Sequence, residues 1–268
     1  CFNHNGKITA PIFDVWMRLL GQVEGSVLWL LEGNAAIGAN LRKEAVARGF
    51  RVTINCTLFT ANAVPERVVQ FFDYVMGLGV EGITVAPGYA YERAPVQDQF
   101  LGRTQTKELF RTIFRKGKEN ARKWVFNQST MYLDFLAGNQ NFECTPWGMP
   151  ARNIFGWQKP CYLLGEGYAK TFKELMDSVE WDKYGTGAYE KCADCMVHCG
   201  YEPTAVSDTF NSPLKALKVF LRGPRTDGPM VPEIAMDKQR PAEYIFEDVV
   251  KKASETLAVT NDNRSDAA

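Results

Sequence analysis

The fold class is decided by residues 51–87, RVTINCTLFTANAVPERVVQFFDYVMGLGVEGITVAP, which hold two strand patterns with a helix pattern between them. Over residues 51–58, apolar and polar side chains alternate as they do along a strand. Pro65 suits the first turn of a helix, and apolar residues then recur at helical spacing as far as Gly77. The short apolar run 82–86 predicts a second strand. This order predicts an α/β layer with parallel strands and a right-handed crossover.

The first of these strands carries three polar side chains, Thr53, Asn55 and Thr57, opposite its apolar residues. If the strand belongs to a parallel barrel, its apolar face meets helices and its polar face lines the cavity. We therefore expect these three residues to bind a cofactor or substrate; the alternative is that they satisfy neighbouring backbone groups. Because ligands bind beyond the carboxyl ends of parallel strands, residues 57–60 and 87–93 are predicted to border the site.

Further elements are predicted on both sides of this unit. The apolar run 26–31 predicts a buried strand, and Asn40 is expected to cap a helix over 41–48 that stops at Gly49. Downstream, apolar spacing predicts an amphipathic helix closed by residues 115–117, and residues 123–127 suit a fourth strand.

Beyond about residue 140 the sequence becomes rich in Gly, Pro, Trp and Cys and loses its periodicity. This composition predicts a small domain that is organised around something other than a large apolar core. Thr171 and Glu174 form a capping-box pattern. The expected elements are a helix after Thr171, a helix over 213–221, a loop over 223–241, a helix over 243–257 and a polar tail over 261–268.

The composition is that of a globular protein, with 268 residues of which 46% are hydrophobic. Equal numbers of basic and acidic side chains, 31 of each, give no electrostatic footprint for nucleic acid, so no nucleic-acid partner is expected. There is no apolar run of transmembrane length and no secretory signal pattern, which predicts a cytoplasmic location. Because the sequence starts at Cys1 and not at Met, we expect a cut chain or an incomplete reading frame.

Cysteine spacing carries the strongest chemical signal. Five of the seven cysteines gather in the final half of the chain: Cys144, Cys161, Cys192, Cys195 and Cys199. In a cytoplasmic chain, clustered cysteines favour a metal site over disulfides. The last three follow the pattern C-x2-C-x3-C, and such a short run with more distant cysteines is typical of iron–sulfur ligation. The alternatives are a structural zinc site that includes His198, or incidental buried thiols. Five thiols compete for four positions.

Two other segments have two interpretations each. The aromatic residues near the first two clustered cysteines either form the wall of a pocket for a polycyclic ligand or pack around the metal site: Trp147, Phe155, Trp157 and Tyr162. Residues 213–222 are apolar but carry Lys215, Lys218 and Arg222, so they form either a core-packing helix with solvated cations or a helix that rests on a membrane.

Five runs of the sequence are distinctive: FRVTINCTLF (50–59), GITVAPGYAYER (82–93), LDFLAGN (133–139), GWQKPCYLLGEGY (156–168) and YEKCADCMVHCGY (189–201). Through these runs, residues 50–268 resemble the C-terminal part of a hopanoid-biosynthesis family of radical S-adenosylmethionine proteins, the adenosylhopane synthases. The pattern C-x11-G-x4-C followed by C-x2-C-x3-C also resembles the auxiliary-cluster extensions, of SPASM and twitch type, found behind many radical S-adenosylmethionine barrels.

This resemblance implies a four-iron four-sulfur cluster of the auxiliary type, with Cys144, Cys161, Cys192, Cys195 and Cys199 as the candidate ligands. It also implies S-adenosylmethionine as cofactor, a reducing electron donor and a hopene-type triterpenoid substrate. The implied reaction adds a 5′-deoxyadenosyl radical to the hopene alkene and forms a carbon–carbon bond. A bacterial cytoplasm, with peripheral membrane contact, is the implied location.

The chain departs from that family at the motif that generates the radical. The family binds its catalytic cluster through a C-x3-C-x2-C loop, and no such spacing occurs in the 268 residues. Barrel strands that precede residue 51 in the family are also replaced. We therefore expect this chain to be inactive alone, and a non-catalytic zinc or iron–sulfur binding module is the alternative function.

The first 49 residues contain Cys1–Asn3, Lys7-Ile8, Pro11, Trp16, the run 26–31, Asn40-Leu41 and Arg48-Gly49. These residues carry a resemblance to a piece of the catalytic region of the O-linked N-acetylglucosamine transferases. It implies that Lys7 contacts the diphosphate of a UDP-sugar, whereas a lone Lys in a loop is usually just solvated. UDP-GlcNAc transfer is the weaker functional alternative. The two resemblances together predict a chimeric reading frame with its junction at residues 49 and 50.

The resulting fold-class prediction is α/β: a partial (β/α) radical S-adenosylmethionine barrel fragment with parallel strands, followed by a Cys-rich auxiliary-cluster-like domain. Four parts are expected: a glycosyltransferase-like fragment (1–49), the barrel fragment (50–140), the Cys-rich domain (141–222), and a loop, helix and tail (223–268).

Overall fold

The computed structural model describes residues 8–30, 35–91, 94 and 96–235. Its chain divides into two compact units. The first contains residues 1–55, 70–84 and 123–127, and the second contains residues 56–69, 85–122 and 128–268. Lys7, the predicted helix over 243–257 and the polar tail over 261–268 lie outside the described residues.

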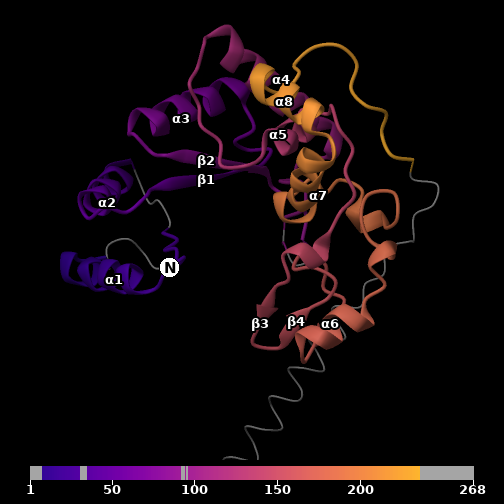
Figure 1. Cartoon of the computed structure of the whole chain (residues 1–268), viewed down its shortest axis with the longest axis horizontal. Helices are drawn as coiled ribbons and strands as arrows, with labels where there is room; N and C mark the ends of the chain where they lie inside the picture. The colour runs from indigo at the N-terminus through magenta and orange to yellow at the C-terminus, as the bar shows by residue number, and fades with distance from the viewer. Residues whose placement is uncertain (1–7, 31–34, 92–93, 95, 236–268) are drawn as a thin grey trace, which may run out of the picture. The chain divides into compact units, whose positions relative to one another are not determined.

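The strand–helix–strand prediction is confirmed. Strands β1 (Thr53–Leu58) and β2 (Gly82–Pro87) pair side by side in a two-stranded sheet, and helix α3 (Pro65–Gly77) connects them (Figure 1). The amide of Glu81 donates to the Val52 carbonyl and the amide of Gly88 donates to the Leu58 carbonyl, so the strands run in the same direction.

The sheet gains only one further contact from the predicted fourth strand. Within residues 123–127, Phe126 forms an isolated parallel bridge with Ile83. In the first unit the fully buried ring of Phe72 packs edge-on against Trp124 and Phe126, with ring centroids 5.3 and 5.7 Å away. An α/β fold with a small parallel sheet is therefore confirmed, but the described residues pair no further parallel strands and do not close a barrel.

Two predictions for the N-terminal part are wrong. The described part of the run 26–31, residues 26–30, forms no strand. Its Val27 and Trp29 are exposed, whereas the prediction required a buried segment.

 Helix α2 (Ala35–Ala47) begins before the expected cap, so that Asn40 lies inside it; the strong helix former Ala at its start explains the earlier beginning. Helix α1 (Ala10–Gln22) precedes the run 26–30 and α2, and it buries only Phe13 and Met17.

The core of the second unit is helical. Helices α4 (Arg103–Glu119), α5 (Thr130–Leu136), α7 (His198–Asn211) and α8 (Pro213–Arg222) pack against one another (Figure 1). Phe135 of α5 stacks on Tyr201 of α7 with ring centroids 5.0 Å apart. Helices α4 and α8 match their predicted apolar spacing, although α4 runs past the expected stop to Glu119. Helix α7 was not predicted, because it contains the poor helix formers Gly200 and Pro203.

A smaller layer lies between α5 and α7 in the sequence. Strands β3 (Arg152–Asn153), β4 (Gly156–Gln158) and β5 (Tyr168–Ala169) form an antiparallel sheet that contacts helix α6 (Phe172–Ser178). The capping prediction for α6 is confirmed, since the Thr171 hydroxyl accepts from the Glu174 amide at 3.1 Å. Three short 3-10 turns complete the layer: η2 (Pro146–Gly148), η3 (Trp181–Lys183) and η4 (Glu190–Cys192).

Residues 223–235, which we call the C-terminal strap, follow α8 without regular structure, as predicted for this part of the loop. The strap is held by a buried polar network centred on Asn139. The Asn139 amide nitrogen donates to Asp134 at 2.7 Å and to the Arg225 carbonyl at 2.8 Å. Its oxygen accepts from the guanidinium groups of Arg111, at 2.7 Å, and Arg225, at 3.1 Å. Every hydrogen-bonding position of this side chain is therefore used.

Replacing Asn139 by Ala is expected to lower the free energy of unfolding by about 3 kcal/mol, because Arg111 and Asp134 would each lose a buried partner. Urea unfolding monitored by circular dichroism measures the change. Asn211→Ala, at an exposed position, serves as the control and should change stability by less than about 0.5 kcal/mol. Equal effects of the two substitutions would show that the network does not hold the strap.

Candidate functional site

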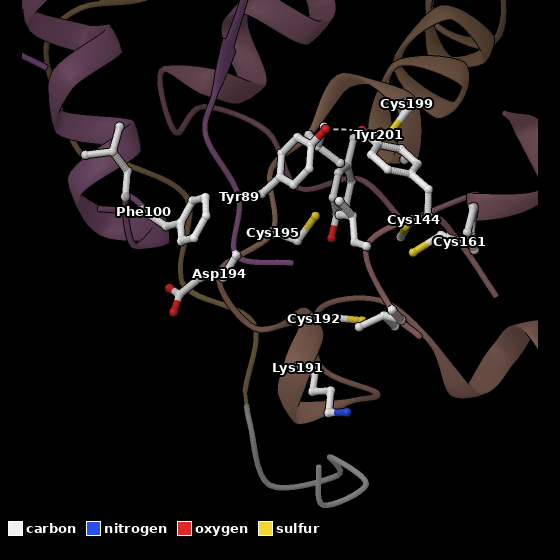
Figure 2. A pocket seen from close by; sticks show the side chains of 18 of the residues that line it. Tyr89, Phe100, Cys144, Cys161, Lys191, Cys192, Asp194, Cys195, Cys199 and Tyr201 are labelled. Atoms are coloured by element: carbon white, nitrogen blue, oxygen red, sulfur yellow. Dashed lines mark hydrogen bonds between the residues drawn. The ribbon is translucent and has the colours of Figure 1, made fainter. Parts of the chain in front are cut away.

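All five clustered cysteines line one cavity of about 170 Å³ in the second unit (Figure 2). They come from three separate stretches of the chain. Cys144 precedes η2, Cys161 lies between β4 and β5, and the third stretch supplies Cys192 at the end of η4, Cys195 in the following loop and Cys199 in the first turn of α7. A cavity of about 150 Å³ is large enough to hold a molecule of the size of benzene. The structure thus places all five predicted ligand candidates around one cavity.

Specific contacts bring the first stretch to the third. The Thr145 amide and hydroxyl both donate to the Gly200 carbonyl, at 2.7 and 3.1 Å. A side chain at Gly200 would begin 2.8 Å from the sulfur of Cys144, closer than real Cβ atoms come to their neighbours. The absence of a side chain at residue 200 therefore leaves space for the Cys144 sulfur beside α7.

The thiols of the cavity are strongly desolvated. Burial raises the pKa of Cys161 to about 12, and it raises the pKa values of Cys144, Cys195 and Cys199 as well. The charges of neighbouring cysteine thiolates raise the pKa values of Cys144 and Cys195 further. These groups therefore stay protonated near neutral pH, and a bound cation would be needed to favour their thiolate forms.

The sulfurs surround the cavity but do not form a finished ligand set. Among the described residues, no three His, Cys, Asp or Glu side chains are grouped so that they could hold a metal ion. His198 does not line the cavity, although it precedes Cys199 in the sequence, and its Nδ1 is buried without a hydrogen bond. Its pKa is lowered by burial. The lining thus offers sulfur ligands and no imidazole.

Two tyrosines form a polar wall of the cavity. Tyr89 follows β2, in one of the loops predicted to border a site, and Tyr162 follows Cys161. Their hydroxyl groups share a hydrogen bond, and their rings are nearly perpendicular with centroids 5.8 Å apart. The Cys199 thiol donates to the Tyr162 hydroxyl at 3.4 Å. Leu163 and Val197 add apolar surface.

The remaining aromatic candidates lie elsewhere. Of the four aromatic residues predicted to surround the site, only Tyr162 lines the cavity. Trp147 and Phe155 are exposed, and Trp157 packs edge-on against Phe172 with ring centroids 5.3 Å apart. The prediction of an aromatic wall or packing shell is therefore wrong for these three residues, because Trp147 on η2 and Phe155 between β3 and β4 are exposed and Trp157 on β4 packs against α6.

The predicted cofactor-binding residues on β1 are not among those that line this cavity. Thr53 and Asn55 are exposed, and Thr57 is half-buried. The Thr57 carbonyl accepts from the Asn62 side chain at 3.2 Å. A role for these residues in binding stays a prediction, and Lys7 lies outside the described part of the chain.

The loop that carries Cys192 and Cys195 is anchored to the helical core. The Asp194 carboxylate accepts from the Arg103 amide at 2.8 Å and so occupies the start of α4. Figure 2 shows Asp194 turned away from the neighbouring cysteines, whose sulfurs lie toward the cavity. The Met196 carbonyl accepts from the buried Tyr132 hydroxyl of α5 at 2.8 Å.

Arg103 is the third anchor, and its side chain is almost fully buried, with 5% of its surface exposed. One guanidinium nitrogen donates to the Cys195 carbonyl at 3.1 Å and to the Thr186 hydroxyl at 3.3 Å. The same group lies over the rings of Phe135 and Tyr201, 5.3 and 5.9 Å from their centroids. Its Nε is 3.4 Å from a carboxylate oxygen of Glu233.

Sequence reasoning missed Arg103 and Asp194. A signal was present for the first, because Arg103 lies four and seven residues before Lys107 and Phe110, on the apolar stripe of a helix. A cation in such a stripe indicates a buried charge with specific partners. Lys107 follows the same rule, since it is fully buried and pairs with Glu233 at 2.7 Å. For Asp194 there was no signal beyond its place between two cysteines.

Comparisons with known proteins give one family match. A family model described as "Domain of unknown function (DUF3463)" matches residues 83–219. No curated protein matches. A solved structure described as native anSMEcpe with bound AdoMet is similar with a TM-score of 0.40 and 13% sequence identity. That likeness covers 70% of this chain and 61% of the other, so this chain spans less than two thirds of that structure, and at such a score it supports no conclusion about function.

Replacing Arg103 by Ala is expected to lower the free energy of unfolding by about 3 kcal/mol, because two hydrogen bonds and two ring contacts of a buried cation are lost. Arg103→Lys keeps the positive charge but lacks the planar guanidinium group, so it should recover less than half of the lost free energy of unfolding. Denaturant unfolding measures both variants. Arg67→Ala is the matched control at an exposed position, and a loss as large in that control would contradict the anchoring role.

Proposed function

The chain belongs to the family described as DUF3463, a domain of unknown function, and on this premise we propose that its matched region binds a four-iron four-sulfur cluster through four of its five clustered cysteines. The observation that carries the proposal is the arrangement of these cysteines. Three stretches, separated by up to about 50 residues, send thiols to the lining of a single cavity. Incidental buried thiols have no reason to share one cavity in this way.

The number of thiols and the size of the cavity favour an iron–sulfur cluster over zinc. Cysteine thiolates are the usual ligands of such clusters, and structural zinc sites use either four cysteines or cysteine together with histidine. The cavity lining contains sulfur, and His198 lies outside it. Its volume also exceeds what a single ion needs. A zinc-binding module is the alternative, and metal analysis distinguishes the two.

The chain's own residues have definite tasks in this proposal. Cys144, Cys161, Cys192, Cys195 and Cys199 are the ligand candidates, and Leu163 and Val197 keep water from the cavity. Arg103, Asp194 and Tyr132 hold the loop around Cys195 in place. A cluster bound there would supply one-electron transfer, the chemistry for which proteins use such groups.

The finer proposal concerns the reaction. The five sequence runs that resemble the adenosylhopane synthases include two that contain four of the five cavity cysteines, 156–168 and 189–201, and one that contains Tyr89. We infer that the matched region descends from a radical S-adenosylmethionine enzyme that joins a 5′-deoxyadenosyl group to a hopene. In that setting the region contributes an auxiliary cluster, and a reducing electron donor and a hopene-type substrate are the partners.

Anaerobic reconstitution with iron and sulfide is expected to give about four irons per chain, with the charge-transfer absorption of a cluster. Alanine substitution at each cavity cysteine tests the ligand set. Four of the five variants should lose most of the iron, and the fifth should keep it, because five thiols surround a group with four thiolate positions.

Cys56→Ala is the matched control for this series. Cys56 is also a desolvated thiol: it is half-buried, and its surroundings raise its pKa to about 12, but it lies on β1 and does not line the cavity. The control variant should bind as much iron as the unmodified chain. One equivalent of zinc without iron, or an iron content that no cavity cysteine affects, would contradict the proposal.

A polypeptide of these 268 residues should not cleave S-adenosylmethionine, because it contains no C-x3-C-x2-C loop for the cluster that performs the cleavage. The reconstituted protein is incubated with S-adenosylmethionine and a strong reductant, and 5′-deoxyadenosine is measured by chromatography. We expect none above a control without protein. Its formation would show that another set of cysteines supports the cleavage.

A further inference from the structure

Helix α8 presents an apolar surface to solvent. We define the α8 face as Leu214, Leu217, Phe220 and Leu221, which are 82, 52, 69 and 72% exposed. Residues 214, 217 and 221 follow one another at the spacing of a single helical stripe. Phe210, at the end of α7, extends the surface and is 79% exposed. Only Ala216 of α8 is buried, so this helix packs on α5 and α7 with one side and leaves most of its apolar side chains exposed.

The sequence around this face is basic. Residues 209–226 contain four basic side chains and no acidic one, although the whole chain has no net charge. Lys215 is already engaged, since it pairs with Asp208 at 2.7 Å and its ammonium lies over the ring of Phe142. Lys218 and Arg222 are exposed on the helix itself. Lys218 and Arg222 therefore flank the α8 face. Contact with an anionic surface would neutralise their charges.

We propose that α8 docks on a lipid surface that carries negative charge, with the α8 face below the headgroups and Lys218 and Arg222 at their level. A helix with bulky apolar residues on one side and Lys or Arg on the other lies in the plane of a membrane interface. Charge complementarity selects this occupant, because the segment has cations and no carboxylate with which to pair a basic partner.

This docking is consistent with the absence of a spanning element. Among the helices that the structure describes, none is long and apolar enough to cross a membrane. A helix of ten residues is about 15 Å long, which is too short to span a bilayer, so α8 would lie along the membrane surface. The inference concerns α8 alone and does not depend on a metal in the cysteine-lined cavity.

Vesicle co-sedimentation of the full chain tests the proposal. The probes are vesicles of phosphatidylcholine alone and vesicles in which about one third of the lipid is phosphatidylglycerol. The double variant Phe220→Ser with Leu221→Ser should lower the partition coefficient on the anionic vesicles by at least about tenfold. Lys218→Gln with Arg222→Gln should lower it by about thirtyfold and should leave the weak binding to phosphatidylcholine unchanged.

Ile154→Ser is the matched control, because Ile154 is 90% exposed and lies in the small antiparallel layer away from α8 in sequence. It should leave binding unchanged, and circular dichroism should show the same fold in all variants. Three results would each overturn the proposal: no binding to the anionic vesicles, equal binding by the control and the α8 variants, or a dimer in light scattering that the Phe220 and Leu221 substitutions convert to a monomer. The last result would identify a second copy of the chain as the occupant.

Discussion

The buried cation of Arg103 is the constraint on which the second unit depends. A guanidinium group is costly to remove from water unless its donors and its charge find partners. Here Nη1 donates to the Cys195 carbonyl and the Thr186 hydroxyl, whereas Nε and Nη2 make no hydrogen bond. The charge lies near the rings of Phe135 and Tyr201 and a carboxylate oxygen of Glu233. These groups belong to the cysteine loop, the helical core and the C-terminal strap. One side chain therefore fixes all three together, and the position of the cysteine loop follows from it.

Local patterns predicted much of the fold because their causes are local. The alternation in residues 51–58, the spacing after Pro65 and the Thr171 cap correspond to β1, α3 and α6. The run 26–31 shows the limit of such reasoning, since an apolar segment becomes a strand only if another strand pairs with it. Likewise α7 forms despite Gly200 and Pro203, because its Tyr201 and Ala205 are buried in the core.

The candidate site could be predicted from the sequence as a set of residues but not as an arrangement. Cysteine spacing identified all five thiols that line the cavity. It could not identify the contacts that gather them, because these join distant stretches: Thr145 with Gly200, and Asp194 with the start of α4. The spacing also could not indicate that Thr53 and Asn55 lie on an exposed part of β1. Such facts depend on tertiary packing, which no short pattern records.

Iron K-edge X-ray absorption of the reconstituted protein tests the central claim most directly, because it reports the atoms bound to the metal. Cysteine ligation of a cluster in this cavity predicts a first shell of sulfur alone and a second shell of iron. A first shell of oxygen or nitrogen, or iron without neighbouring iron, would contradict the account.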